Sequence, residues 1–152
     1  MPINFAQKAR NYAFLLLKFR PRSVEEMRGR LKKKGFSSDI IKDTISFLKE
    51  KEFLDDRNFA SGWVENRLKR PFGLRRIKQE LKAKGIDKEL IEQQLQQTSQ
   101  NYFEQKIVEK LARDKWARLK NIDPRKAKTR IYGYLARRGF SPDAIIDILN
   151  HL

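Results

Sequence analysis

The chain has 152 residues, 39% of them hydrophobic, and carries 35 Lys and Arg against 19 Asp and Glu, a net charge of +16 at pH 7. It contains no cysteine, which excludes disulfides and thiol chemistry, and its apolar run over residues 12–17 is too short to span a membrane. We therefore expect a cytoplasmic protein with no membrane segment, whose excess of positive charge is suited to a polyanionic partner.

One pattern recurs three times along the chain. A leucine is followed four residues later by a glycine and six residues after that by an isoleucine, with Phe or Ile directly after each glycine. A period of about fifty residues indicates one structural unit copied three times. The three copies are Leu31-Gly35-Ile41, Leu81-Gly85-Ile91 and Leu135-Gly139-Ile145.

Each copy has apolar residues at helical spacing in three segments, and no segment shows the alternation of a strand. We therefore predict an all-α fold of three tandem three-helix repeats, resembling helix-turn-helix units, that form an elongated, curved solenoid. The predicted repeats span residues 1–54, 55–99 and 100–152. In chain order, the predicted helices lie at 12–17, 24–34 and 37–52, then from Phe59, at 74–84 and 87–97, and finally at 107–116, 124–138 and 141–152.

Capping residues set the ends of the predicted helices. Each repeat glycine follows a helix, where a left-handed residue costs glycine far less than an L-amino acid, so we expect three left-handed caps. Ser23 and Glu26 have the spacing of a capping box, and Asp55 precedes the Phe59 helix as an N-cap. Ser37, Asp87 and Ser141 are the expected caps after the glycines.

Two glycines lie inside second helices. Gly29 and Gly133 occupy the same repeat position. A helical glycine lowers stability, so its presence predicts close approach of another helix.

Positive charge is concentrated on the second helix of each copy. Residues 24–34 carry five basic and two acidic side chains, residues 74–84 carry five and one, and residues 124–138 carry six and none. The third helices are slightly acidic. Since the charge is patterned, polyanion contact by the second helices is favoured over a role in solubility alone.

Candidate contact residues follow from a helical wheel of the middle copy. Arg75, Lys78 and Lys82 share one flank, away from the apolar stripe, and Arg76 lies beside them. In copy one, Arg28 and Lys32 occupy the matching places. These six residues are our candidates for binding a partner protein or DNA. The alternative is a solvated face, since exposed helix positions favour Lys and Arg.

The sequence offers little for catalysis. The one histidine, His151, is next to the C-terminus, where helices fray. Asp55 and Asp56 directly precede a helix, which favours capping over acid-base chemistry. We predict no enzymatic activity, no catalytic residues, no metal site and no cofactor.

The spacing of leucine, glycine and isoleucine also fits the helix-turn-helix of DNA-binding repressors. In that motif the helix after the glycine enters the major groove and contacts phosphates and base edges. Here that helix is the acidic one. A stand-alone DNA-binding or architectural protein is therefore the alternative hypothesis.

Three strings of residues resemble motifs of the RecX regulatory protein family. The order and spacing of the strings and the length of the chain agree with that family. The strings are Arg22-Ser23-x-x-Glu26-Met27-x-x-x-Leu31-x-x-Lys34-Gly35-Phe36, then Phe53-Leu54-Asp55-Asp56-x-x-Phe59-Ala60, and Gly73-x-x-Arg76-Ile77-x-x-Glu80-Leu81-x-x-Lys84-Gly85-Ile86.

The resemblance implies a function that composition alone does not supply. RecX proteins modulate the RecA recombinase, usually by inhibiting its filaments on single-stranded DNA. By this resemblance we expect a monomeric regulator, active in DNA repair, homologous recombination and the SOS response, that binds RecA and the RecA filament and binds DNA weakly. The resemblance carries over no active-site residue, so the candidate contacts depend on charge placement.

Overall fold

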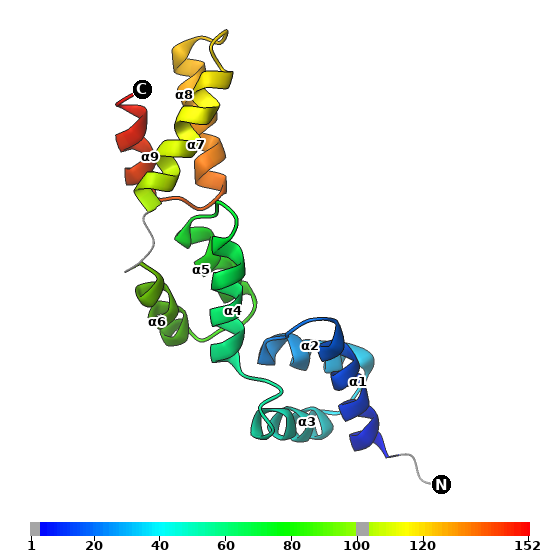
Figure 1. The fold of residues 1–152 in the computed structure, drawn as a ribbon. Helices are drawn as coiled ribbons and strands as arrows, with labels where there is room; N and C mark the ends of the chain where they lie inside the picture. The colour runs from blue at the N-terminus through cyan, green and yellow to red at the C-terminus, as the bar shows by residue number, and fades with distance from the viewer. Residues whose placement is uncertain (1–3, 100–103) are drawn as a thin grey trace. The chain divides into compact units, whose positions relative to one another are not determined.

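A computed structural model describes residues 4–99 and 104–152 (Figure 1). Within these ranges all regular secondary structure is helical, which confirms the all-α prediction. The nine helices of the described ranges are α1 (Phe5–Phe19), α2 (Val24–Lys34), α3 (Ser38–Glu50), α4 (Asp56–Leu68), α5 (Leu74–Ala83), α6 (Lys88–Ser99), α7 (Glu104–Arg118), α8 (Pro124–Arg137) and α9 (Pro142–Leu149).

The helices follow the predicted order of three per repeat. Helices α1, α2 and α3 pack against one another, and so do α7, α8 and α9. By compactness the chain divides into two units, one reaching to Trp63 and including Leu81–Leu90, the other comprising Val64–Glu80 and the residues from Ile91 onward. The repeat boundaries at 54/55 and 99/100 stay predictions, and the second meets residues 100–103, outside the described ranges.

The apolar stripe of each second helix is buried. Met27 and Leu31 of α2, Ile77 and Leu81 of α5, and Ile131 and Leu135 of α8 have no exposed surface. In the first repeat this stripe meets Ala9, Ala13 and Leu16 of α1 and Ile41, Ile45 and Leu48 of α3. The spacing that predicts the second helices is therefore the spacing of their buried faces.

Each repeat glycine ends a second helix in the left-handed conformation. The φ angles are +100° at Gly35, +76° at Gly85 and +89° at Gly139. The residue after each glycine donates its N–H to the carbonyl of the repeat leucine, as Phe36 does to Leu31 at 3.2 Å. This is the Schellman arrangement, and it explains why leucine, glycine and the following apolar residue recur together. The three predicted caps are confirmed.

The N-terminal caps agree with the sequence in most places. Ser23 and Glu26 form a capping box, the Ser37 side chain accepts from the Ile40 N–H, and the Asp55 carboxylate accepts from two N–H groups of the first turn of α4. Ser141 occupies the N-cap of α9 without a side-chain bond, and its own N–H donates to Glu104 at 2.7 Å. The cap at Asp87 stays a prediction.

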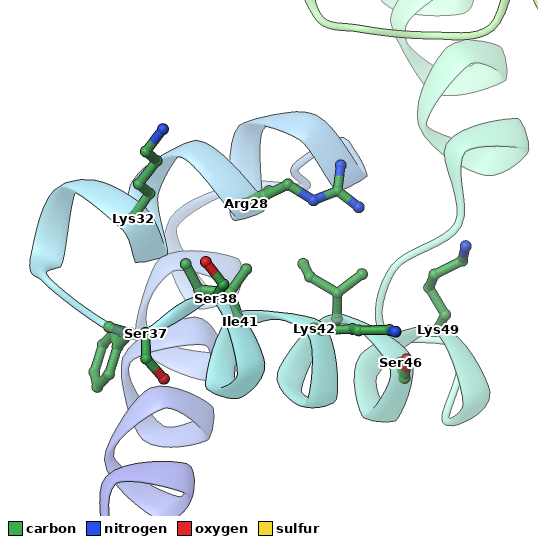
Figure 2. A pocket seen from close by; sticks show the side chains of 10 residues that line it. Arg28, Lys32, Ser37, Ser38, Ile41, Lys42, Ser46 and Lys49 are labelled. Carbon is green, nitrogen blue, oxygen red and sulfur yellow. The ribbon is translucent and has the colours of Figure 1, made fainter.

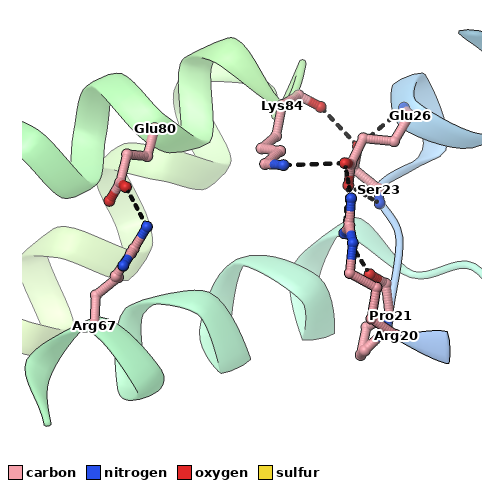
Figure 3. Close-up of polar contacts among 7 residues, drawn as sticks. All are labelled: Arg20, Pro21, Ser23, Glu26, Arg67, Glu80 and Lys84. Atoms are coloured by element: carbon pink, nitrogen blue, oxygen red, sulfur yellow. Dashed lines mark hydrogen bonds and ion pairs between the residues drawn. The ribbon is translucent and has the colours of Figure 1, made fainter.

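The start of α2 docks onto the turn that follows α5 (Figure 3). The Ser23 hydroxyl donates to the Lys84 carbonyl at 2.7 Å, and Lys84 Nζ donates to Glu26 Oε2 at 3.0 Å. Arg20 holds the same carboxylate oxygen at 2.5 Å. The capping box therefore has two roles. It caps the N-terminus of α2, and it binds the residue that follows the C-terminus of α5.

The start of α5 also docks onto a glycine turn, the one that follows α8, but through backbone hydrogen bonds. The Gly73 N–H donates to the Arg138 carbonyl at 2.8 Å, and the Arg75 N–H donates to the Gly139 carbonyl at 3.1 Å. The Arg76 guanidinium lies 4.4 Å from the Phe72 ring centroid and donates to the Arg137 carbonyl at 3.4 Å. The first turn of each of these second helices therefore meets the glycine turn one repeat further along the chain.

Glu26 is the charged centre of the first of these junctions. Its side chain is 16% exposed. Burial alone would raise its pKa, but hydrogen bonds from Arg20, the Ser23 N–H and Lys84, together with the Lys84 charge, lower the pKa to about 2. The ionised form of Glu26 therefore stabilises the folded state.

The prediction of close helix approach at Gly29 and Gly133 is wrong. A Cβ at Gly29 would meet no atom within 4 Å, and one at Gly133 would meet only the Arg137 side chain. Gly29 and Gly133 therefore share a position in the repeated helix, but neither marks a close contact with another helix.

Substitution of three glycines separates backbone strain from steric clash. At Gly35 an added Cβ has open space, so Gly35→Ala should cost only the strain of a positive φ, about 1–2 kcal/mol. At Gly73 a Cβ would lie 2.5 Å from Phe140 N without a positive φ, so Gly73→Ala should reveal the clash. Gly139→Ala combines both and should lower the urea unfolding midpoint most. If Gly139→Ala and Gly35→Ala have equal unfolding midpoints, the junction between the start of α5 and the turn after α8 contributes nothing to stability.

The pH dependence of stability should report Glu26. An unfolded glutamate has a pKa of about 4.3, so stabilisation by the lower folded pKa is complete above about pH 5 and is lost as pH falls to about 2. Glu26→Gln should lower the free energy of unfolding by about 2 kcal/mol at pH 7, and the difference from the wild type should vanish near pH 2. Chemical unfolding at several pH values measures this.

The matched control is Glu25→Gln, because Glu25 is exposed and its one ion pair within residues 4–99 and 104–152 is with the exposed Arg28. A surface pair of this kind contributes at most about 1 kcal/mol. Equal losses from the two variants at pH 7 would contradict the role of Glu26.

Candidate polyanion-binding surface

Three of the six candidate residues lie on one flank of α5. Arg75, Lys78 and Lys82 are exposed, while Ile77 and Leu81 of the same helix are buried, as the helical wheel predicts. Within the described part of the chain, none of the three pairs with an acidic side chain. Their ammonium and guanidinium groups are therefore available to an anionic partner.

Arg76 differs from its neighbours. It is half-buried, with its guanidinium on Phe72 and the Arg137 carbonyl, and its Cβ would clash with a Cβ added at Gly139. These contacts give it a structural role in the junction between α5 and the turn after α8. Its role as a contact residue stays a prediction.

Arg28 and Lys32 lie on the exposed side of α2, where they line a groove against α3. Arg28 forms an ion pair with Glu25. Lys42 and Lys49 of α3 line the same groove. Summed charge does not single out these two lysines, because the net charge of α3 is negative, although their seven-residue spacing places them on one helix face.

A further basic surface lies on α8. Arg125, Lys126, Thr129 and Arg130 line a shallow hollow of about 320 Å³. Arg125 and Lys126 lie in the first turn of α8. Positive charge there is unfavourable, because the N-terminus carries the positive end of the helix dipole. The charge count of this helix pointed to it, but no residue of α8 was among the six candidates.

The paired carboxylates Asp55 and Asp56 have structural partners. Asp55 caps α4, and Asp56 accepts a hydrogen bond from the Val24 N–H at 2.9 Å. Among residues 4–99 and 104–152 no group of three or more His, Asp or Glu side chains is placed to hold a metal ion. No helix in those ranges is long and apolar enough to cross a membrane.

The fold and the surface define a class: an all-α protein of tandem three-helix repeats whose second helices carry exposed positive charge. Models of the three RecX three-helix domains match the chain in order, the first at residues 9–48, the second at 55–95 and the third at 104–149. The chain belongs to the RecX family.

Individual relatives agree along most of the chain. The regulatory protein RecX of Haemophilus influenzae is 30% identical over 140 residues, which cover 91% of each chain. That of Pasteurella multocida is 33% identical over 144 residues, covering 94% of this chain and 87% of the relative. The crystal structure of RecX from Lactobacillus salivarius has a TM-score of 0.80 at 26% identity and covers 97% of this chain and 96% of its own.

The salt dependence of DNA binding should report the flank of α5. Each phosphate contact on single-stranded DNA contributes about 0.7 to the slope of log affinity against log salt. Replacing Arg75, Lys78 and Lys82 with alanine should therefore reduce the slope by about two units. Titration of fluorescent oligo(dT) at several salt concentrations measures this. The variant should unfold at the wild-type midpoint because all three side chains are exposed.

The matched control replaces Lys18, Lys69 and Lys110 with alanine. These lysines are exposed and lie on other helices or loops, so the control removes the same charge. An equal loss of slope in both variants would show that the flank of α5 contributes only to the general field of the protein.

Proposed function

We propose that this protein regulates the RecA recombinase by binding RecA and its filament on single-stranded DNA. It acts there as an inhibitor of ATP hydrolysis, recombination and strand exchange, without catalysis of its own. Cytoplasmic location, a monomeric state and a role in DNA repair and the SOS response belong to the same proposal. The observation that carries it is the ordered match to all three RecX domains.

The placement of charge supports this proposal. A RecA filament is assembled on a phosphate backbone, and exposed cations are attracted to such a polyanion. The second helices present these cations: Arg75, Lys78 and Lys82 on α5, with Arg125 and Arg130 on α8. The relatives named above are described as regulatory proteins, which favours a regulator over an enzyme.

The alternative is a stand-alone DNA-binding protein that reads a duplex through its helix-turn-helix units. The helices after the glycines argue against it. Helix α6 carries Glu89 and Glu92, and α9 carries Asp143 and Asp147, all exposed. Carboxylates on a helix in the major groove would face phosphates, and like charges repel.

The decisive measurement is RecA-dependent ATP hydrolysis on single-stranded DNA with increasing amounts of this protein. The proposal predicts a fall to a low plateau, and no hydrolysis by the protein alone. An unchanged rate at saturation would refute regulation, and intrinsic turnover would refute the absence of catalysis.

Measurement of duplex DNA binding distinguishes the RecA regulator from a stand-alone DNA-binding protein. A repressor prefers its own site over random duplex by about 10³-fold or more, and we expect no such preference. The alanine variant of Arg75, Lys78 and Lys82 adds a second readout. If that variant loses inhibition but keeps the wild-type salt slope, these residues contact RecA and not phosphate.

A further inference from the structure

The first repeat contains a groove between α2 and α3 with a volume of about 770 Å³. This volume is within the range of ligand-binding clefts. Figure 2 shows the side chains of both helices around it. The lining consists of Arg28, Lys32, Phe36, Ser37, Ser38, Ile41, Lys42, Ile45, Ser46 and Lys49.

Positive charge stands on both walls of this groove. Arg28 and Lys32 come from α2, Lys42 and Lys49 come from α3, and the lining includes no acidic side chain. Glu25 pairs with Arg28, whereas the three lysines pair with no carboxylate in the described part of the chain. The groove therefore favours a ligand that carries negative charge.

The floor of the groove is apolar. This feature distinguishes two classes of anionic ligand, nucleic acids and acidic peptides. Ile41 and Ile45 form it with Phe36, whose ring packs 6.4 Å from the ring of Tyr12. Single-stranded nucleic acids bind by stacking bases on exposed aromatic rings, and this groove offers aliphatic side chains and one ring already packed. Aliphatic anchors of a peptide fit such a floor better than bases do.

The other repeats do not keep this arrangement. Aligned on the leucine and glycine of each copy, Lys42 corresponds to Glu92 and Ile146, and Lys49 corresponds to Ser99. Arg28 and Lys32 correspond to Lys78 and Lys82 in the second copy. The α2 side is therefore basic in the first two copies but not in the third, where Tyr132 and Ala136 take these places, and a basic α3 side occurs only in the first copy. Basic side chains on both walls therefore distinguish the first repeat from the other two.

We propose that the groove between α2 and α3 binds an acidic amphipathic helix of a partner protein. Aliphatic residues spaced i, i+3 and i+4 on that helix contact Ile41, Ile45 and Phe36, and its flanking carboxylates meet the lysines on both walls. The inference goes beyond the proposed function, because it assigns a peptide ligand by chemistry and holds whether or not the protein inhibits RecA.

A synthetic peptide of about 18 residues, made of Glu and Leu with the leucines on one helical face, is the probe. Binding is measured by fluorescence anisotropy against the full chain. The comparison peptide has the same composition in a scrambled order that spreads the leucines around the helix. We expect the amphipathic peptide to bind at least about tenfold more tightly than the scrambled one.

Two variants localise the binding. Lys42→Glu with Lys49→Ser places the second-copy residues in the first copy, and should weaken binding of the amphipathic peptide at least about tenfold. Lys110→Glu with Lys120→Ser makes the same charge change at exposed positions on α7 and just after it, and should weaken binding less than about threefold. Ser46→Phe fills the groove from an exposed position without changing charge, and should also abolish binding.

Three outcomes would overturn the inference. Equal binding of the two peptides would show that no apolar floor is used, and equal losses from both charge variants would show attraction to the whole basic protein. If oligo(dT) displaces the amphipathic peptide and the groove variant loses oligo(dT) affinity to the same extent, the groove is a nucleic-acid site. Circular dichroism and unfolding midpoints confirm that each variant is folded.

Discussion

The contact between the first turn of one second helix and the glycine turn of the next repeat supports much of this structure. It occurs twice, once at Lys84 and Gly85 and once at Arg138 and Gly139. In both, the helix start donates a hydrogen bond to a carbonyl of the turn that a helix end leaves without a partner, and in the first Lys84 also donates to Glu26. Docking one on the other satisfies groups that water would otherwise have to solvate.

This contact places a strict requirement on the glycines. At Gly139 an added Cβ would lie 2.2 Å from Arg76 Cβ, and at Gly85 it would lie 2.5 Å from Glu25 Cβ. The turn must therefore be glycine for two reasons, the positive φ and the close approach of the neighbouring helix. At Gly35 only the first reason applies, since an added Cβ would meet no atom of the described residues within 4 Å.

Sequence patterns could predict the helices, their caps and the buried stripes, because each depends on residues a few positions apart. The capping box at Ser23 and Glu26 is such a local signal. Its second role, binding Lys84, joins residues about sixty positions apart and has no local signal. The same limit applies to Asp56, whose spacing indicated a cap and whose carboxylate instead accepts from Val24.

The candidate site could be predicted in part for the same reason. Exposure of Arg75, Lys78 and Lys82 follows from helical periodicity, but the junction role of Arg76 depends on a turn far along the chain. Lys42 and Lys49 were missed because summing charge over a helix averages its faces. Tertiary packing selects one face, and on α3 that face is basic although the helix as a whole is slightly acidic.

Repetition allows one chain to present different surfaces on one scaffold. Buried positions such as Leu31, Leu81 and Leu135 stay the same because packing constrains them. The exposed position of Lys42 is free to become Glu92 or Ile146, since a solvent-facing helix position tolerates all three. Ligand preference can therefore change in one repeat without a cost in the core or in the glycine junctions. The proposed phosphate contacts of α5 and the proposed peptide groove of the first repeat are compatible within the same fold, because they use different side chains of different helices.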